Sequence, residues 1–148
     1  MKKRLKELWI KALESGYNQA DGTLKTIRDD VVQHCCLGVL CEVIAKDTAP
    51  SSVQLAKRIV IRPDNINILN YEGEFDSTSV LDCILDELGM DEEVQSALMA
   101  ANDEGTSFAE IADIIRKSGT LASYRTFANK DWNRLTPDPD AEEDNDER

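Results

Sequence analysis

The sequence lacks several features that would place a protein in a familiar functional class. No apolar run reaches the 18 residues expected of a bilayer-spanning helix. The basic start Met1–Arg4 is not followed by the apolar core of a signal peptide. The glycines form no phosphate-binding pattern, and no internal repeat is present. We therefore expect a protein without a membrane span that stays in the cytoplasm.

The composition is that of a globular protein, with 41% hydrophobic and 31% charged residues. It predicts one compact, mostly helical α+β domain over residues 1–136, with a buried central helix and a small β-hairpin or sheet. Residues 137–148 hold seven carboxylates and one arginine, a net charge of −6, and no large apolar side chain. Such a segment cannot fold alone, so we expect a disordered acidic tail.

Three of the four cysteines lie in the run 34–41, which continues as an almost uninterrupted apolar segment to Ala45. A helix that is apolar on nearly every side is buried, so this segment is predicted to form the centre of the domain. Two metal ligands on one helix must lie three or four residues apart, and His34, Cys35, Cys36 and Cys41 offer no such separation. We expect reduced packing thiols, with no metal and no cofactor.

Two neighbours of these thiols need separate interpretation. His34 precedes Cys35, but adjacent helical residues point about 100° apart, so an activated thiolate is not implied. A lone buried histidine is usually neutral and hydrogen-bonded, and the sequence does not identify the partner of His34. Gly38 is predicted to mark the place where another element comes close to the helix backbone.

Hydrophobic spacing and turn chemistry predict the elements of the first half. A helix over residues 5–13 should place Trp9 on the core and end at Gly16. Asp30 and Gln33 form a capping pair for the central helix, although residues 22–32 suit a short strand or hairpin equally well. Two β-branched runs, 58–62 and 66–71, flank a turn at residues 63–65 and predict a hairpin.

The second half is predicted to be helical. Ser79 with Asp82 caps a helix that Gly89 ends, and a second helix begins at Asp91. Residues 102–105 should form a turn. Ser107 with Glu110 then caps a third helix, whose apolar face includes Phe108 and Ile111.

Three sequence blocks resemble a family of small bacteriophage-encoded proteins. The first block comprises Trp9, Ala12, Leu13, Ser15, Gly16, Tyr17, Gln19, Gly22 and Leu24; the second is CCLGVLC at residues 35–41; the third comprises Asn102, Asp103, Gly105, Ser107, Phe108, Ile111, Ala112 and Asp113. The similarity covers residues 5–115, whereas residues 47–76 and the acidic tail do not match. The resemblance implies a phage accessory protein acting in the bacterial cytoplasm, and it implies no catalytic residues.

This setting favours a non-enzymatic protein that binds and modulates a host or defence protein with a basic surface. The acidic tail either steers the chain to that partner or only keeps it soluble. Tyr17 either packs on the first helix or anchors the partner, and Trp132 either pins the C-terminal segment or is an exposed contact. The candidate partner-binding residues are Tyr17, Trp132, Asp138, Asp140, Glu142, Glu143, Asp144, Asp146 and Glu147.

The alternative hypothesis is a helix-turn-helix DNA-binding regulator, with its first helix near Phe108 and its second over residues 120–127. Five basic residues against Asp131 alone give residues 116–136 a net charge of +4, which suits phosphate contacts. The candidate DNA-binding residues are Arg116, Lys117, Arg125, Lys130 and Arg134. Two features oppose this hypothesis. Gly119 lies seven residues after Ala112, whereas the motif would have its turn near the fourth position, and the overall charge is −12.

An enzyme is the third hypothesis. Acidic pairs such as Asp29 with Asp30 and Asp103 with Glu104 are available for acid or base catalysis. Carboxylates at turns and helix starts already serve as caps, so these pairs do not indicate a catalytic site. We therefore predict no catalytic residues.

Overall fold

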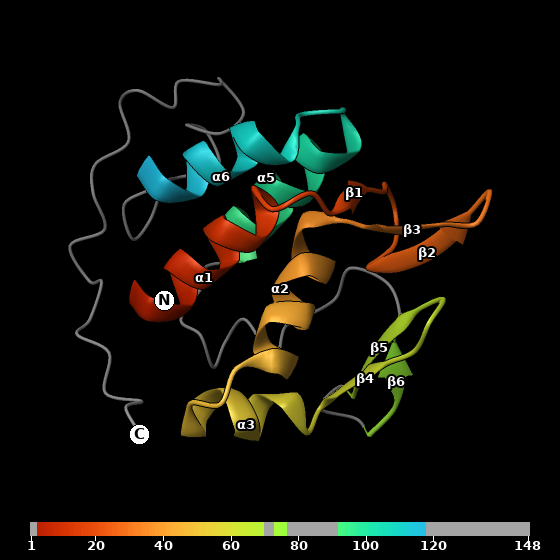
Figure 1. Cartoon of the computed structure of the whole chain (residues 1–148), viewed down its shortest axis with the longest axis vertical. Helices are drawn as coiled ribbons and strands as arrows, with labels where there is room; N and C mark the ends of the chain where they lie inside the picture. The colour runs from red at the N-terminus through yellow and green to blue at the C-terminus, as the bar shows by residue number, and fades with distance from the viewer. Residues whose placement is uncertain (1–2, 70–72, 77–91, 118–148) are drawn as a thin grey trace.

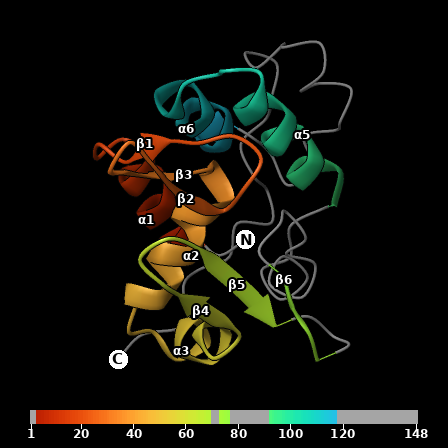
Figure 2. The same ribbon diagram turned by 90° about the vertical axis from the view of Figure 1, so that its right-hand side faces the viewer.

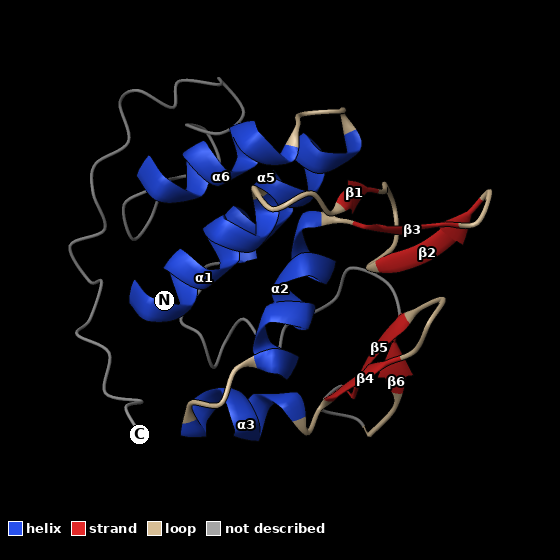
Figure 3. Ribbon diagram, in the orientation of Figure 1, coloured by secondary structure: helices blue, strands red, loops and turns tan. Residues whose placement is uncertain are grey.

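The computed structural model describes residues 3–69, 73–76 and 92–117. Within these residues the fold is α+β, as the sequence predicts, with the central helix surrounded by other helices and two small sheets (Figures 1 and 3). The helices are α1 (Lys3–Leu13), α2 (Cys36–Lys46), α3 (Pro50–Ala56), α5 (Glu92–Asp103) and α6 (Phe108–Lys117). The strands are β1 (Asn18–Gln19), β2 (Lys25–Arg28), β3 (Val31–His34), β4 (Ile59–Ile61), β5 (Ile66–Leu69) and β6 (Phe75–Asp76).

Helix α2 is the centre of the fold, which confirms the interpretation of the cysteine-bearing segment. It contacts α1, α3, α5, β3 and β4, and all but three of its residues are buried. The helix begins after Cys35, whose thiol accepts a hydrogen bond from the Gly38 N–H group at 3.3 Å. In Figure 1 the sheets lie to the right of α2 and helices α1 and α6 lie to its left; Figure 2 shows the sheets from the front.

Helix α1 packs on α2 through Trp9, which is fully buried as predicted. The indole Nε1 of Trp9 donates a hydrogen bond to the carbonyl oxygen of Cys36 at 2.9 Å. At the other end of α2, the carboxylate of Asp47 accepts hydrogen bonds from Arg4 and Ser52, each at 2.7 Å. The hydrogen bond from Arg4 is the main reason why the pKa of Asp47 falls to about 2. These bonds hold α1 against both ends of α2 and α3 against its C-terminal end.

The segment before α2 forms a hairpin, not the first turn of the helix. Strands β2 and β3 pair antiparallel, β1 joins β3 in parallel, and the resulting order is β1-β3-β2. Asp29 and Asp30 form the tip with positive φ angles of 50° and 65°, a conformation that Asp tolerates better than most residues. The expected capping pair of Asp30 with Gln33 is therefore wrong, and the hairpin alternative is confirmed. His34 ends β3, so the helical spacing considered for it does not apply.

The second sheet confirms the other predicted hairpin and extends it. Strands β4 and β5 pair antiparallel around a turn in which the Arg62 N–H group donates to the Asn65 carbonyl oxygen at 2.9 Å, and β6 adds to β5. Helix α3 was not predicted. Pro50 lies at its first position, where a proline lacks only an N–H group that would have no helical partner.

Helices α5 and α6 agree with the sequence except at one boundary. Asn102 and Asp103 belong to the last turn of α5, whereas a turn was expected there, because Asn102 is held by three hydrogen bonds described below. The capping pair of Ser107 with Glu110 is confirmed by two hydrogen bonds at the start of α6. The helix predicted to begin near Ser79 lies outside the described residues. No described helix has the length and apolarity to span a bilayer.

Candidate functional site

The side chain of Asn102 joins three segments that are far apart in the sequence. Its Oδ1 atom accepts hydrogen bonds from Gln19 Nε2 at 3.1 Å and from the Cys36 N–H group at 3.2 Å. Its Nδ2 atom donates to the Ala20 carbonyl oxygen at 2.6 Å. Asn102 is 2% exposed, so this polar junction is protected from water. One residue from each of the three sequence blocks meets here.

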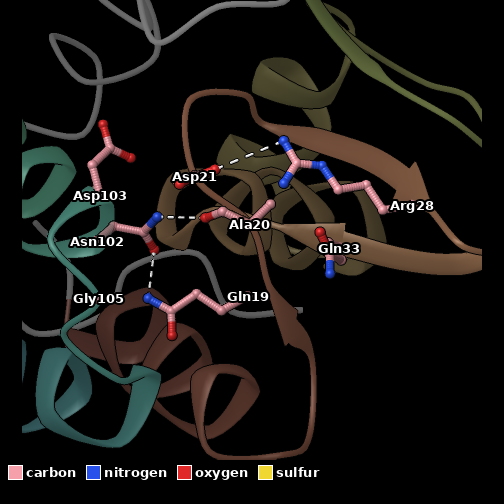
Figure 4. A pocket seen from close by; sticks show the side chains of 8 residues that line it. All are labelled: Gln19, Ala20, Asp21, Arg28, Gln33, Asn102, Asp103 and Gly105. Carbon is pink, nitrogen blue, oxygen red and sulfur yellow. Dashed lines mark hydrogen bonds and ion pairs between the residues drawn. The ribbon is translucent and has the colours of Figure 1, made fainter.

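A pocket of about 320 Å³ lies beside this junction, between the β2–β3 hairpin and the end of α5 (Figure 4). In Figure 4, Asn102 and Asp103 lie on one side of Ala20, and Arg28 and Gln33 lie on the other. The pocket is lined by Gln19, Ala20, Asp21, Arg28, Gln33, Asn102, Asp103 and Gly105. Ala20 is the only one of these with an apolar side chain, so the pocket is suited to a hydrogen-bonding ligand.

The charged groups of this pocket are only partly paired. Asp103 Oδ1 accepts a hydrogen bond from the Gly22 N–H group at 3.1 Å. Arg28 lies 4.0 Å from Asp21, the outer limit of an ion pair, and both side chains are more than 60% exposed. No described residue donates to Asp103 Oδ2 or bonds the side-chain amide of Gln33. The pocket therefore offers a carboxylate oxygen and an amide to an incoming group.

A second polar cluster is buried between the first sheet and α2. His34 Nε2 lies 2.9 Å from Glu42 Oε2, and Lys25 Nζ donates to the same oxygen at 3.3 Å. Burial lowers the pKa of His34, although its contact with Glu42 opposes that change. Burial alone would raise the pKa of Glu42, but the hydrogen bond from His34 and the charge of Lys25 outweigh it and lower that pKa. Neutral His34 therefore donates from Nε2 to an ionised Glu42.

The other ring nitrogen of His34, Nδ1, is buried and has no hydrogen-bond partner among the described residues. The rings of Tyr17 and His34 pack in a T-shaped arrangement with the two centroids 5.0 Å apart. Because the side chain of His34 is only 5% exposed, the imidazole is poorly placed for acid or base catalysis on a substrate.

The cysteines of the central segment are chemically protected. Cys35, Cys36 and Cys41 have no exposed surface. A helix N-terminus ordinarily favours a thiolate, but burial dominates and raises the pKa of Cys35 to about 11 and that of Cys36 well above its usual value. Within the described segments, no group of three or more His, Cys, Asp or Glu residues is arranged to hold a metal ion.

The β2–β3 hairpin exposes apolar side chains. Ile27, Val31 and Val32 have exposed fractions of 40%, 41% and 40%. Ile27 and Val32 are cross-strand partners, and Val31 is paired with Arg28, the residue that reaches the pocket. Figure 1 shows this hairpin extending away from the helices. An apolar surface next to a polar pocket is an arrangement found where proteins dock.

The structure describes only two of the predicted binding residues with their side chains. Tyr17 is half-buried against His34 and accepts a hydrogen bond from Lys46 at 3.2 Å, so it packs on the fold and is not free to project. Arg116 is held by Glu14 at 2.9 Å and by Asp113. The other predicted binding residues lie outside the described part of the chain. They are the Lys117 side chain, Arg125, Lys130, Arg134, Trp132 and the tail carboxylates Asp138, Asp140, Glu142, Glu143, Asp144, Asp146 and Glu147.

Sequence reasoning missed both the pocket and the apolar hairpin surface. The pocket residues come from segments about 80 residues apart, and no local pattern indicates that Asn102 faces Gln19. One usable signal was present, because Gln19, Asn102 and Asp103 all belong to the sequence blocks that resemble the phage proteins.

Comparison with known proteins identifies a family without indicating a function. No curated protein and no solved structure matches the chain. One family model, described as a domain of unknown function, DUF8296, matches residues 1–119, which include every described element. The chain therefore belongs to the DUF8296 family.

Proposed function

We propose that the protein is a non-catalytic, phage-encoded accessory protein that binds and modulates a host or defence protein in the bacterial cytoplasm. The observation that carries this proposal is the group of exposed aliphatic side chains, Ile27, Val31 and Val32, on the projecting hairpin. Ile27 and Val32 lie together on one face of the hairpin and Val31 lies on the other face, so a partner that binds the hairpin would cover exposed apolar surface. The protected thiols and the enclosed His34 support a function without catalysis.

Charge indicates the chemistry of the partner. The apolar side chains are flanked by exposed carboxylates, with Asp29 and Asp30 at the hairpin tip and Asp21 next to it. The whole chain has a net charge of −12, half of which is on residues 137–148. A partner with an apolar contact area surrounded by basic residues matches this surface. The acidic tail would raise the rate of association at low salt, since charges act over about 8 Å at physiological ionic strength.

The test begins with affinity capture from a bacterial lysate and continues with the purified partner. Binding is measured for the wild type, for Ile27→Thr/Val32→Thr and for the control Val53→Thr. The control removes a comparable exposed aliphatic group, 45% exposed, from α3. We expect the hairpin variant to lose about tenfold in affinity, equivalent to roughly 1.4 kcal/mol, and the control to bind as the wild type does.

Equal binding by all three proteins would refute the hairpin as the binding surface. Deletion of residues 137–148 should slow association at low salt and change nothing at high salt. Salt-sensitive binding to duplex DNA without a protein partner would instead favour the helix-turn-helix alternative. Arg116 would contribute little to such binding, because Glu14 and Asp113 already neutralise it.

A further inference from the structure

We propose that the pocket between the β2–β3 hairpin and the end of α5 binds a guanidinium group, supplied by an arginine side chain of the partner. That a partner supplies this arginine rests on the proposed function. The affinity of the pocket for a guanidinium group is independent of it. Arg28 and Gln33 of the pocket lie on the same face of the hairpin as the exposed Val31, whereas Ile27 and Val32 lie on the opposite face. A partner that binds around the hairpin would therefore reach both the pocket and these aliphatic side chains.

The size and lining of the pocket suit one polar side chain. Its volume of about 320 Å³ is at the lower end of the range for ligand sites, too small for a large cofactor but sufficient for the end of an arginine. Ala20 alone supplies an apolar side chain, so an apolar ligand would find almost nothing to contact. A ligand must therefore be recognised by hydrogen bonds and charge.

The hydrogen-bonding groups favour a donor-rich cation over an anion. Two carboxylates, Asp21 and Asp103, line the pocket against one cation, Arg28. Asp103 Oδ2 and the Gln33 carbonyl oxygen are acceptors that no described residue uses. A guanidinium carries five N–H donors in a plane and can bond a carboxylate and an amide oxygen together, which an ammonium group does less well.

The acceptor wall is held in place before any ligand binds. Asp103 follows Asn102, whose buried side chain is fixed by bonds to Gln19, Ala20 and Cys36. The bond from the Gly22 N–H group to Asp103 Oδ1 then orients the carboxylate and leaves Oδ2 open. A preorganised acceptor lowers the entropic cost of binding.

Substitution of Arg28 distinguishes a cationic ligand from an anionic one, because it should change their affinities in opposite directions. Its guanidinium is 4.0 Å from Asp21 and its side chain is 66% exposed, so it can be displaced. It carries the same charge as the proposed ligand and competes for Asp21. Removal of its charge should therefore strengthen the binding of a guanidinium, whereas it would weaken the binding of any anion.

The experiment uses the full chain and Nα-acetylarginine methylamide, with binding followed by NMR shifts of backbone amides. The citrulline and lysine derivatives are the comparison ligands, because citrulline has nearly the same shape without the charge. We expect the arginine derivative to shift residues 19–22, 33 and 103–105 and to bind roughly tenfold more tightly than the citrulline derivative. The lysine derivative should bind more weakly than the arginine derivative.

Three variants complete the test. Asp103→Asn keeps an oxygen for the Gly22 N–H group but loses the charge, so affinity should fall about tenfold. Arg28→Gln should raise affinity. Glu7→Gln is the control for Asp103→Asn: it removes one negative charge from an exposed position on α1 and should leave the affinity unchanged. Equal binding of citrulline, weaker binding by Arg28→Gln, or no shifts at these residues would overturn the proposal.

The outcome is independent of the proposed function, because no partner is present. Ile27→Thr/Val32→Thr should bind the arginine derivative as the wild type does while losing affinity for the captured partner. A protein that binds arginine but shows no hairpin-dependent partner refutes only the proposed function. A protein with such a partner but no arginine affinity refutes only the pocket proposal.

Discussion

The backbone of Leu24 lies directly against Gly38 of the central helix. A Cβ atom placed on Gly38 would be 1.8 Å from the carbonyl oxygen of Leu24. The same oxygen accepts a hydrogen bond from the Cys35 N–H group at 3.2 Å. Leu24 therefore cannot move away without losing this bond, which joins the residue before β2 to the residue before α2. Gly38 is therefore required by contact between two backbones.

Gly38→Ala should destabilise the protein by about 2 kcal/mol or more, because the new methyl group would overlap a fixed carbonyl group. Chemical denaturation followed by circular dichroism measures this loss. Gln54→Ala, at an exposed position of α3, is the control and should change the free energy of unfolding by less than about 0.5 kcal/mol. Similar stability of the two variants would show that Leu24 can retreat.

Asn102→Ala should cost about 3 kcal/mol of unfolding free energy. The change leaves the Ala20 carbonyl oxygen and the Cys36 N–H group buried without a partner, and unpaired buried groups cost about 1–3 kcal/mol each. Thermal or denaturant unfolding gives the value, with Ser96→Ala on the exposed face of α5 as the control. A loss no greater than that of the control would mean that water replaces the amide without penalty.

Stability should depend on pH through His34. The pKa of His34 in the folded protein is lowered from its usual 6.5, so the unfolded chain binds the proton more readily. The free energy of unfolding should therefore decrease as the pH falls below about 6.5, and the decrease should end once His34 is protonated in the folded protein as well. Denaturation series between pH about 7.5 and about 5.5 measure the effect.

Two charged neighbours of His34 keep their charge in this pH range. The pKa of Glu42 is lowered by the hydrogen bond from His34 and the charge of Lys25, and the pKa of Lys46 is raised by its hydrogen bond with Tyr17. His34→Gln should flatten the profile, and since the chain has one histidine, its NMR titration reports the same event. A flat wild-type profile, or a titration near 6.5, would contradict the prediction.

The three thiols of the central segment should resist modification. Cys83 lies outside the described residues, so the experiment uses a Cys83→Ser background. In this background a maleimide should label no thiol while the protein is folded, because Cys35, Cys36 and Cys41 are fully buried. In denaturant it should label all three. Rapid labelling of the folded protein would show that the central segment opens or is reactive.

The sequence predicted those parts of the fold that have a local signal. The apolar character of residues 35–45 identified the buried helix, the close approach at Gly38 was expected, and the pair of Ser107 with Glu110 marked the start of α6. Helix α3 was missed because its only cue is Pro50. The end of α5 was misplaced because Asn102 and Asp103 favour turns by propensity, whereas bonds to residues 66 to 83 positions away hold Asn102 in the helix.

The sequence contains almost no local signal for the candidate site. Asp21, Arg28, Gln33 and Asp103 are ordinary surface residues, and only the tertiary fold places them around one pocket. Ile27 and Val32 fit a strand, but their exposure depends on what covers the hairpin, which periodicity does not specify. The opposite applies to Tyr17, whose aromatic ring suggested a partner contact but packs against His34.

The polar junction at Asn102 determines how the chain can be divided. The last turn of α5 supplies the partners for backbone groups of residues 20 and 36, so a polypeptide that ends before α5, at residue 91, would bury these groups unpaired. Neither residues 1–91 nor residues 92–148 should then acquire the native structure in isolation. Mixed together, the two pieces should reconstitute it by fragment complementation, with Asn102 as the residue on which their assembly depends.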